Sequence, residues 1–415
     1  MYHITTLSNG VRILTERIPD LRSAALGLWV ATGSRHETAA QSGAAHFIEH
    51  MVFKGTSDQS AAQLAQRMDA IGGQVNAFTT KECTCFYARA LDTHLTEALD
   101  ILCSMLFDAR FDQADVETER GVILEEIGMY RDTPDDLCSE RLTAAVYKGS
   151  SLGRPILGTP ATLASMTGEF LRAYRDSQYI PQRMVVSLAG SFDDSLVEEI
   201  KARFSALAPG RPQEPKPAVY HPAVTLKKKA TEQNHLIVAF PSIPLNSPDR
   251  FGMQLLSSML GGGMSSRLFQ EVREKRGLCY SVYSYGACHE ETGIFAVYTA
   301  LSRETEDQAL STIRETVDAF ARDGVSQAEL DRAREQSKAN VLMGLESTTA
   351  RMNHLARSVL YQDRILSPDE IIAAYDAVTR EDIHRLAEST FRWERAALSA
   401  VGRVAGKEHY QAALA

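Results

Sequence analysis

Two histidines and a glutamate in the segment 43–53 have the types and the spacing of a metal-dependent hydrolytic site. We expect this segment to be a short helix that Ser42 can cap. A helix advances 100° per residue, so His46, Glu49 and His50 share one face. The imidazole pair can bind one Zn²⁺, and the glutamate can take a proton from a water that the metal activates. Alone, the pattern is equally compatible with structural histidines.

A third metal ligand should be an acidic side chain that is forced to face inward. The stretch 115–130 has strong helical periodicity, with a stripe of apolar residues on one face. Glu119 and Glu126 lie two turns apart along the edge of that stripe, whereas Glu125 points to the opposite side. A carboxylate beside a buried stripe is costly unless something pairs with it, and a metal would do so. We predict Glu126 as the third ligand and Glu119 as a carboxylate that orients a ligand; the alternative is a solvated glutamate-rich helix edge.

The motifs His46-Phe47-Ile48-Glu49-His50 and Glu119-Arg120-Gly121-Val122-Ile123-Leu124-Glu125-Glu126 resemble those of the pitrilysin-like metallopeptidases, or inverzincins. This family includes pitrilysin, insulysin and the mitochondrial processing peptidase. The resemblance implies that His46, His50 and Glu126 bind zinc, that Glu49 is the general base, and that Glu119 matches an acidic position near the metal. The similarity runs along the whole chain and is greatest to half-length bacterial members that are similar to the processing peptidase.

The segments 74–80 and 84–88 both look like strands, and the residues alone favour a plain hairpin. The resemblance implies more for the first of them. In the family, the strand that matches Asn76, Ala77 and Phe78 is an exposed edge beside the metal, and substrate adds to it as an extra strand. Main-chain pairing of this kind holds any extended peptide, so we expect selectivity to come from side-chain pockets.

Arg273 and Tyr280 lie seven residues apart in the second half of the chain. By residue type alone they are a basic helix end and a strand tyrosine, for which a structural role is favoured. The resemblance reverses this interpretation, because an arginine and a tyrosine at this place in the family reach the substrate backbone near the zinc. It implies that Tyr280 stabilises the oxyanion and that Arg273 holds a substrate carbonyl.

The chain of 415 residues is too long for one ordinary core. Residues 167–190 and 379–402 align without a gap, each as a helix followed by a strand, and a proline-rich linker lies between them. We predict a catalytic domain over 1–208, a linker over 209–221 and a homologous second domain over 222–415. The expected class is α+β, with a largely antiparallel sheet in each domain and helices packed on one face.

Composition excludes several classes of protein. Hydrophobic residues make up 44% and charged residues 23%, as in soluble globular proteins. The formal net charge of −9 argues against nucleic acid as the main partner. No apolar run is long enough to span a membrane, and the first residues do not resemble a secretory signal. The six cysteines form no CxxC pair, which favours the cytoplasm, and packing is favoured over metal binding for Cys83 and Cys85.

The predicted function is a zinc-dependent endopeptidase that cleaves peptides or unfolded, presequence-like segments inside a chamber. The full-length relatives resemble four such halves in one chain, so the resemblance implies a homodimer. In that dimer the zinc comes from one chain, and Arg273 and Tyr280 come from the other. The alternatives are a non-catalytic assembly subunit, which would have lost zinc-site residues, and a purely structural zinc site, which would have no use for Glu49.

Overall fold

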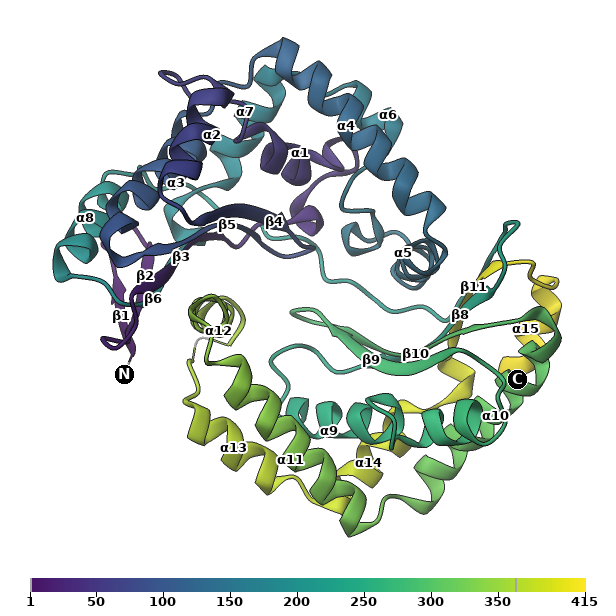
Figure 1. Cartoon of the computed structure of the whole chain (residues 1–415). Coiled ribbons are helices and arrows are strands. Elements are labelled where there is room, and N and C mark those ends of the chain that lie inside the picture. Colours follow the sequence, from purple (N-terminus) through teal and green to yellow (C-terminus); the bar gives the residue numbers. More distant parts are fainter. Residues whose placement is uncertain (1, 363) are drawn as a thin grey trace. The chain divides into compact units, whose positions relative to one another are not determined.

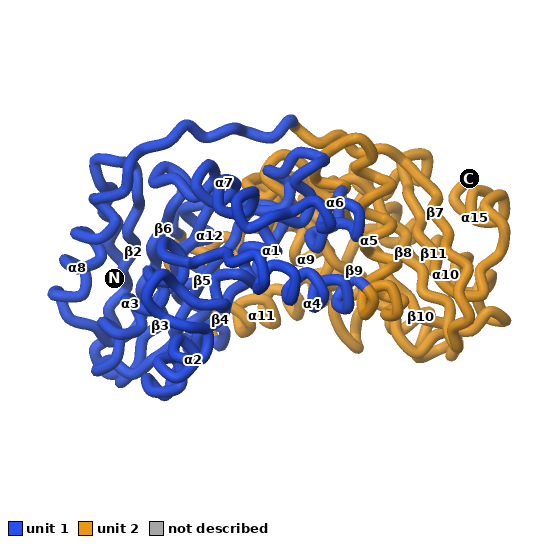
Figure 2. The backbone as a smooth tube through the Cα atoms, turned by 90° about the horizontal axis from the view of Figure 1, so that it is seen from above, with its two compact units in different colours: residues 1–127, 154–216, 343–365 blue, residues 128–153, 217–342, 366–415 orange. Residues whose placement is uncertain are grey.

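The structure is a computed structural model that describes residues 2–362 and 364–415. The chain forms two compact units (Figure 2). Unit 1 consists of residues 1–127, 154–216 and 343–365, and unit 2 consists of residues 128–153, 217–342 and 366–415. These units differ from the predicted domains 1–208 and 222–415, because each half of the sequence contributes one helix to the sheet of the other half. The physical reason is that each sheet has a second apolar face that needs a cover.

The sheet of unit 1 has six strands in the order β1-β2-β6-β3-β5-β4. Only β2 and β6 are parallel, and every other neighbouring pair is antiparallel. The central strand β3 is buried along nearly its whole length, whereas β4 lies at one edge. The strands are β1 (Tyr2–Thr6), β2 (Arg12–Arg17), β3 (Ser23–Val30), β4 (Gln74–Thr79), β5 (Thr84–Leu91) and β6 (Met184–Gly190).

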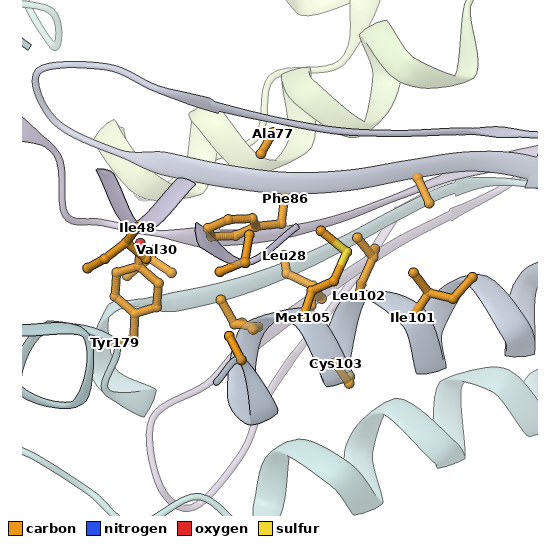
Figure 3. Packing of buried hydrophobic residues seen from close by; sticks show 14 of the residues in the cluster. Leu28, Val30, Ile48, Ala77, Phe86, Ile101, Leu102, Cys103, Met105 and Tyr179 are labelled. Atoms are coloured by element: carbon orange, nitrogen blue, oxygen red, sulfur yellow. The ribbon is translucent and has the colours of Figure 1, made fainter. Parts of the chain in front are cut away.

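Most helices of unit 1 cover one face of this sheet (Figure 1). Alternate strand residues such as Leu28 and Phe86 point into this layer and meet Leu102 and Met105 (Figure 3). Period-two burial of this kind is what a sheet face packed on helices requires. The helices of this part of the chain are α1 (Ala44–Met51), α2 (Ala61–Ala70), α3 (Leu95–Asp108), α4 (Gln113–Asp132), α6 (Pro160–Ala164), α7 (Gly168–Gln178) and α8 (Asp194–Ser205).

The opposite face of the first sheet is covered by α12 (Thr348–Tyr361), which comes from the second half of the sequence. Trp29 is 1% exposed and its indole Nε1 donates to Met352 Sδ at 3.3 Å. Ser187 Oγ donates to the Met352 carbonyl oxygen at 2.9 Å. Cys83 and Cys85 are free thiols buried in the same layer, so they pack there as expected.

The sheet of unit 2 has the order β7-β11-β8-β10-β9, in which only β7 and β11 are parallel. Helices α9, α10 and α14 contribute to the core on one face, and α5 from the first half of the sequence packs on the other. The elements are α5 (Pro134–Val146), β7 (Val224–Lys228), β8 (Asn234–Ser242), α9 (Arg250–Gly261), β9 (Ser281–Cys288), β10 (Gly293–Leu301), α10 (Glu306–Asp323), α11 (Gln327–Gly344), α13 (Pro368–Ala377), α14 (Arg380–Thr390), β11 (Ala397–Gly402) and α15 (Lys407–Leu414).

The predicted class, α+β with two largely antiparallel sheets, is confirmed, and one further helix covers the second face of each sheet. The two repeated segments correspond to α7–β6 and α14–β11. Gly190 and Gly402 end the two strands with φ of 129° and 138°, a conformation that L side chains rarely adopt. Across the described residues, the helices are all too short or too polar to span a bilayer.

Candidate metal centre

Helix α1 presents both histidines of the first motif from a short, well-anchored element. Residues such as Phe47 and Ile48 are fully buried in the core of unit 1 and fix the helix to the sheet. His46 is 7% exposed and His50 is half-buried, and their ring centroids are 4.7 Å apart. The spacing of one helical turn therefore places two imidazoles side by side, as the sequence predicts.

Helix α4 brings a carboxylate to this pair. Its residues Ile123 and Ile127 are buried against the core, so Glu126 faces α1 while Glu125 is exposed. Glu126 Oε2 lies 3.6 Å from His46 Nε2 and 3.6 Å from His50 Nε2. The ligand atoms of these three residues all lie within 4.8 Å of one another. The structure thus brings together the three side chains that the sequence predicts as zinc ligands.

The donor set fits a zinc ion. Two imidazole nitrogens and one carboxylate oxygen are typical of catalytic zinc sites, which have three protein ligands and one open position. Burial lowers the pKa of His46 to about 4, so its ring is neutral, as a metal ligand must be. Burial also disfavours the charged form of His50, but interactions with Glu126 and Glu119 outweigh it and raise its pKa. The interaction with His50 lowers the pKa of Glu126, which favours the carboxylate form.

Glu119 holds the other side of the His50 ring. Its Oε2 lies 3.0 Å from His50 Nδ1, and its Oε1 lies 2.5 Å from Lys54 Nζ. The carboxylate is only 4% exposed, so the lysine supplies the countercharge that such burial requires. With Nδ1 engaged, Nε2 is the His50 nitrogen that faces Glu126. Lys54 was not among the predicted site residues, although a cation directly after the motif helix is visible in the sequence.

Glu49 lies between the two histidines in α1 and next to the end of the edge strand β4. Burial raises the pKa of its carboxyl, and its interaction with Thr79, the last residue of β4, partly offsets this rise. Its Oε2 is buried without a hydrogen-bond partner among the described residues. A buried acceptor left open beside a metal-ligand cluster is suited to receive a proton from water.

The edge strand β4 contains the three residues predicted to meet substrate. The Ala77 N–H donates to the side-chain Oδ1 of Asn76 at 2.8 Å. The Ala77 side chain points into the core with 9% exposure, and the Phe78 ring stacks edge-on against Trp29 at 5.4 Å. The main chain of β4 therefore lies at the edge of the sheet, and Asn76 has the most exposed of the three side chains.

Arg273 and Tyr280 lie in unit 2, whereas the residues of the metal centre lie in unit 1. Arg273 belongs to a short π-helix (Phe269–Glu274), an irregularity that is frequent at functional sites. Its guanidinium lies over the rings of Tyr280 and Phe269, 5.1 Å and 4.8 Å from the centroids. The two predicted residues are therefore in contact with each other. Tyr280 is also 73% exposed, so its side chain is accessible.

The start of α1 corrects one prediction. Ser42 does not cap the helix, because its Oγ is buried without a hydrogen-bond partner among the described residues. Instead, the carboxylate of Glu37 accepts hydrogen bonds from the N–H groups of Gly43 and Ala45, both at 2.8 Å. The local sequence pattern does not predict this contact, because Glu37 lies well before the start of the helix, outside the usual position of a capping residue.

Comparison with known proteins identifies relatives over nearly the whole chain. Residues 12–160 match the family model described as insulinase (peptidase family M16), and residues 165–337 match that of the peptidase M16 inactive domain. The chain is 43% identical to the uncharacterized zinc protease YmxG of Bacillus subtilis, over 93% of this chain and 95% of the relative. It is 39% identical to an uncharacterized zinc protease of Streptomyces coelicolor, over 97% of this chain and 90% of the relative.

Two solved structures share the fold. A peptidase M16 inactive domain from Pseudomonas fluorescens superposes with a TM-score of 0.91 at 21% identity, covering 98% of this chain and 99% of its own. A protease from Helicobacter pylori has a TM-score of 0.89 at 19% identity, and the superposition covers 97% of this chain and 99% of the other. At these identities the likeness concerns the fold alone.

Proposed function

The chain belongs to the insulinase family of zinc-dependent peptidases, family M16, and from that premise we propose that it is an endopeptidase acting on peptides and unfolded segments. One observation supports this most strongly. The nitrogens of His46 and His50 converge with an oxygen of Glu126, and Glu49, on the same helix as the two histidines, has a buried oxygen without a hydrogen-bond partner among the described residues. A purely structural zinc site would have no use for that oxygen.

The residues of the site have separate chemical roles. His46, His50 and Glu126 would hold the zinc, which would supply Lewis acidity and lower the pKa of a water. Glu49 would accept a proton from the attacking water and pass it to the leaving amine. Glu119 keeps His50 in the tautomer whose Nε2 is free to bind, since it engages Nδ1.

The edge strand β4 receives the substrate by main-chain pairing. Two observations support this. The strand is the outermost of its sheet, and the Ala77 N–H bonds to a side chain rather than to a neighbouring strand. A carbonyl oxygen of an extended peptide can replace Asn76 Oδ1 as the acceptor of the Ala77 N–H. The selectivity for peptides and unfolded segments follows, because a folded protein does not offer a free extended main chain.

Arg273 and Tyr280 complete the site from a second chain in a two-fold homodimer. The arginine holds a substrate carbonyl, and the tyrosine hydroxyl donates to the oxyanion. What supports this role is the pairing of the two side chains and the 73% exposure of Tyr280. The chamber of this proposal is enclosed by two such chains.

The test is a digest of a peptide library with and without a zinc chelator. We expect about one zinc per chain by elemental analysis, cleavage that is lost with the metal and restored by adding it, and an unchanged circular dichroism spectrum. The fold should survive, because large cores rather than the metal stabilise the units. Full cleavage by a verified zinc-free sample would refute the proposal.

The composite site is tested by mixing two inactive variants, His50→Ala and Tyr280→Phe, under conditions in which subunits exchange. A mixed dimer has one site with both elements intact and one site with both lesions. We expect activity to return, up to about half that of the wild-type dimer if the sites act independently. If both elements acted within one chain, mixing would give only the average of the two parents.

A further inference from the structure

The segment 33–37, which directly precedes the metal-binding motif, contacts two functional elements of unit 1 at once. Residues Ser34–His36 form a 3₁₀ turn, and Glu37 follows it. One side of this segment bonds to the start of α1, and the other side bonds to the turn that follows the edge strand β4. The predicted roles of the zinc ligands and of the general base explain neither of these two contacts.

On the helix side, the Glu37 carboxylate takes the place of a helix cap. The first N–H groups of a helix have no partner within the helix, and α1 has no side-chain cap of its own. Glu37 accepts from Gly43 and Ala45 with both oxygens and is 3% exposed. Ala45 immediately precedes His46, so the carboxylate holds the backbone one residue away from a zinc ligand.

On the strand side, the same segment pairs with the hairpin turn. The N–H groups of Ser34 and Arg35 donate to the carbonyl oxygens of Thr80 and Lys81 at 3.1 Å and 2.8 Å. The Arg35 guanidinium forms an ion pair with the Glu82 carboxylate, and both residues are buried. Thr80 directly follows β4, so these bonds hold the end of the strand that lies beside Glu49.

Two further features show that the segment 33–37 and the turn after β4 are held close together. A Cβ at Gly33 would lie 2.3 Å from the Thr80 carbonyl oxygen, so the backbones can come this close only at a glycine. Arg154 bridges the two sides, because its guanidinium donates to the Glu37 carbonyl oxygen while its own carbonyl oxygen accepts from Lys81. The helix contact and the strand contact are therefore parts of one hydrogen-bonded unit.

We propose that residues 33–37 are a bracket that fixes the metal helix against the substrate strand, and that Glu37 is a positioning residue for the zinc ligands. A helix of eight residues is too short to be stable by itself, so contacts outside it must hold it, here the buried side chains of Phe47 and Ile48 and the hydrogen bonds to Glu37 at its start. The part of this inference that concerns substrate rests on the proposed function.

The helix contact is tested with Co²⁺ in place of zinc, because the visible absorption of Co²⁺ reports on ligand geometry without any peptide cleavage. Glu37→Ala should weaken Co²⁺ binding by roughly tenfold to a hundredfold and should alter the spectrum, as loss of a supporting partner does. Glu37→Gln keeps one acceptor and should restore most of the affinity. Glu16→Gln is the matched control, since Glu16 forms an ion pair with Arg351 at 2.7 Å in the same unit. It should lower the melting temperature and leave Co²⁺ affinity and spectrum unchanged.

Two outcomes would overturn the positioning role. The first is that the Glu37 variants bind Co²⁺ with wild-type affinity and spectrum and lose only melting temperature, as the control does. The second is that neither Glu37→Ala nor Glu37→Gln folds, which would make the carboxylate a requirement of the fold. Failure of the proposed function gives a different result, in which the zinc-loaded wild type cleaves no peptide although the Co²⁺ measurements respond to Glu37.

The strand contact is tested by replacing the buried ion pair with the neutral pair Arg35→Met and Glu82→Gln, which avoids leaving one buried charge alone. We expect KM for a peptide substrate to rise at least threefold, by analogy with the loss of one hydrogen bond, while kcat and the Co²⁺ spectrum stay unchanged. Glu82→Gln alone, which keeps an acceptor for Arg35, should have a smaller effect on KM. An unchanged KM in the double variant would remove the strand contact from the inference.

Discussion

At the scale of single residues, three glutamates of similar type have different expected roles because of where they point. Glu49→Gln should keep zinc and lose several orders of magnitude in kcat, since an amide cannot accept the proton. Glu126→Gln should weaken zinc binding itself, because this carboxylate lies 3.6 Å from both histidine nitrogens. The measurements are zinc content after dialysis and kcat for a peptide.

Glu125 provides the matched control for these two changes. It is the neighbour of Glu126 in sequence, but its side chain is exposed on α4. Glu125→Gln should change neither zinc content nor kcat by more than about twofold, the usual effect of a surface substitution. If the effects of positions 125 and 126 were exchanged, the assignment of the helix face would be wrong.

His36 gives a prediction about acid. Burial, and then the charges of Arg183 and Arg35, lower its pKa to about 4, against the opposing effects of the Gly33 backbone and of Glu82. The unfolded chain takes up this proton near pH 6.5 and the folded chain only near pH 4. The stabilisation is therefore complete above pH 6.5 and is lost as the pH falls toward 4.

The expected loss at His36 is about 2 kcal/mol of unfolding free energy between pH 7 and pH 5. His36→Asn, which keeps an acceptor for the Gly33 N–H, should lose about 2 kcal/mol less over that interval. Urea unfolding at the two pH values measures this difference. The exposed His3 serves as the control through His3→Asn, and an equal pH dependence in all three proteins would contradict the prediction.

At the scale of elements, the edge strand β4 allows its main chain to be tested separately from its side chains. Ala77→Pro removes an N–H that donates to the Asn76 side chain, so the pairing of β4 with β5 should survive. If substrate pairs with this N–H, KM should rise roughly fivefold to tenfold, the value of about one hydrogen bond. Metal content should stay the same.

Asn76→Ala is the companion substitution for the strand. It removes the side chain that occupies the Ala77 N–H but leaves the N–H itself, so KM should stay the same or fall. Steady-state kinetics on one peptide compares both variants with the wild type. Equal KM values for Ala77→Pro and the wild type would show that substrate does not pair with this N–H.

At the scale of the whole molecule, each sheet depends on a helix from the other half of the sequence. Met352 of α12 is fully buried against Trp29, although the two are far apart in the chain. Met352→Ala should lower the free energy of unfolding by about 2–5 kcal/mol, the cost of a cavity in a close-packed layer. Denaturant unfolding measures this loss.

Met343 is the control for that substitution, because it lies in the same unit and is 60% exposed. Met343→Ala should change the free energy of unfolding by less than about 0.5 kcal/mol. A similar loss in both variants would mean that α12 is not part of the folded core of unit 1.

The sequence by itself determined what depends on short-range geometry. The spacing of His46, Glu49 and His50 places them on one face of any helix, and the apolar stripe of α4 selects Glu126 over Glu125 as the carboxylate that faces inward. The aligned segments 167–190 and 379–402 likewise predict two similar sheet-forming halves, because a helix followed by a strand is encoded locally.

Only the tertiary structure decided which distant segments meet. Nothing in the periodicity of α5 or α12 states which sheet it covers, since an apolar stripe fits any apolar face. The helix cap supplied by Glu37 and the countercharge that Lys54 gives to Glu119 depend on side chains reaching across a fold that local pattern does not specify. The order of residues therefore determines the chemistry of the motif, and long-range packing decides how it is held.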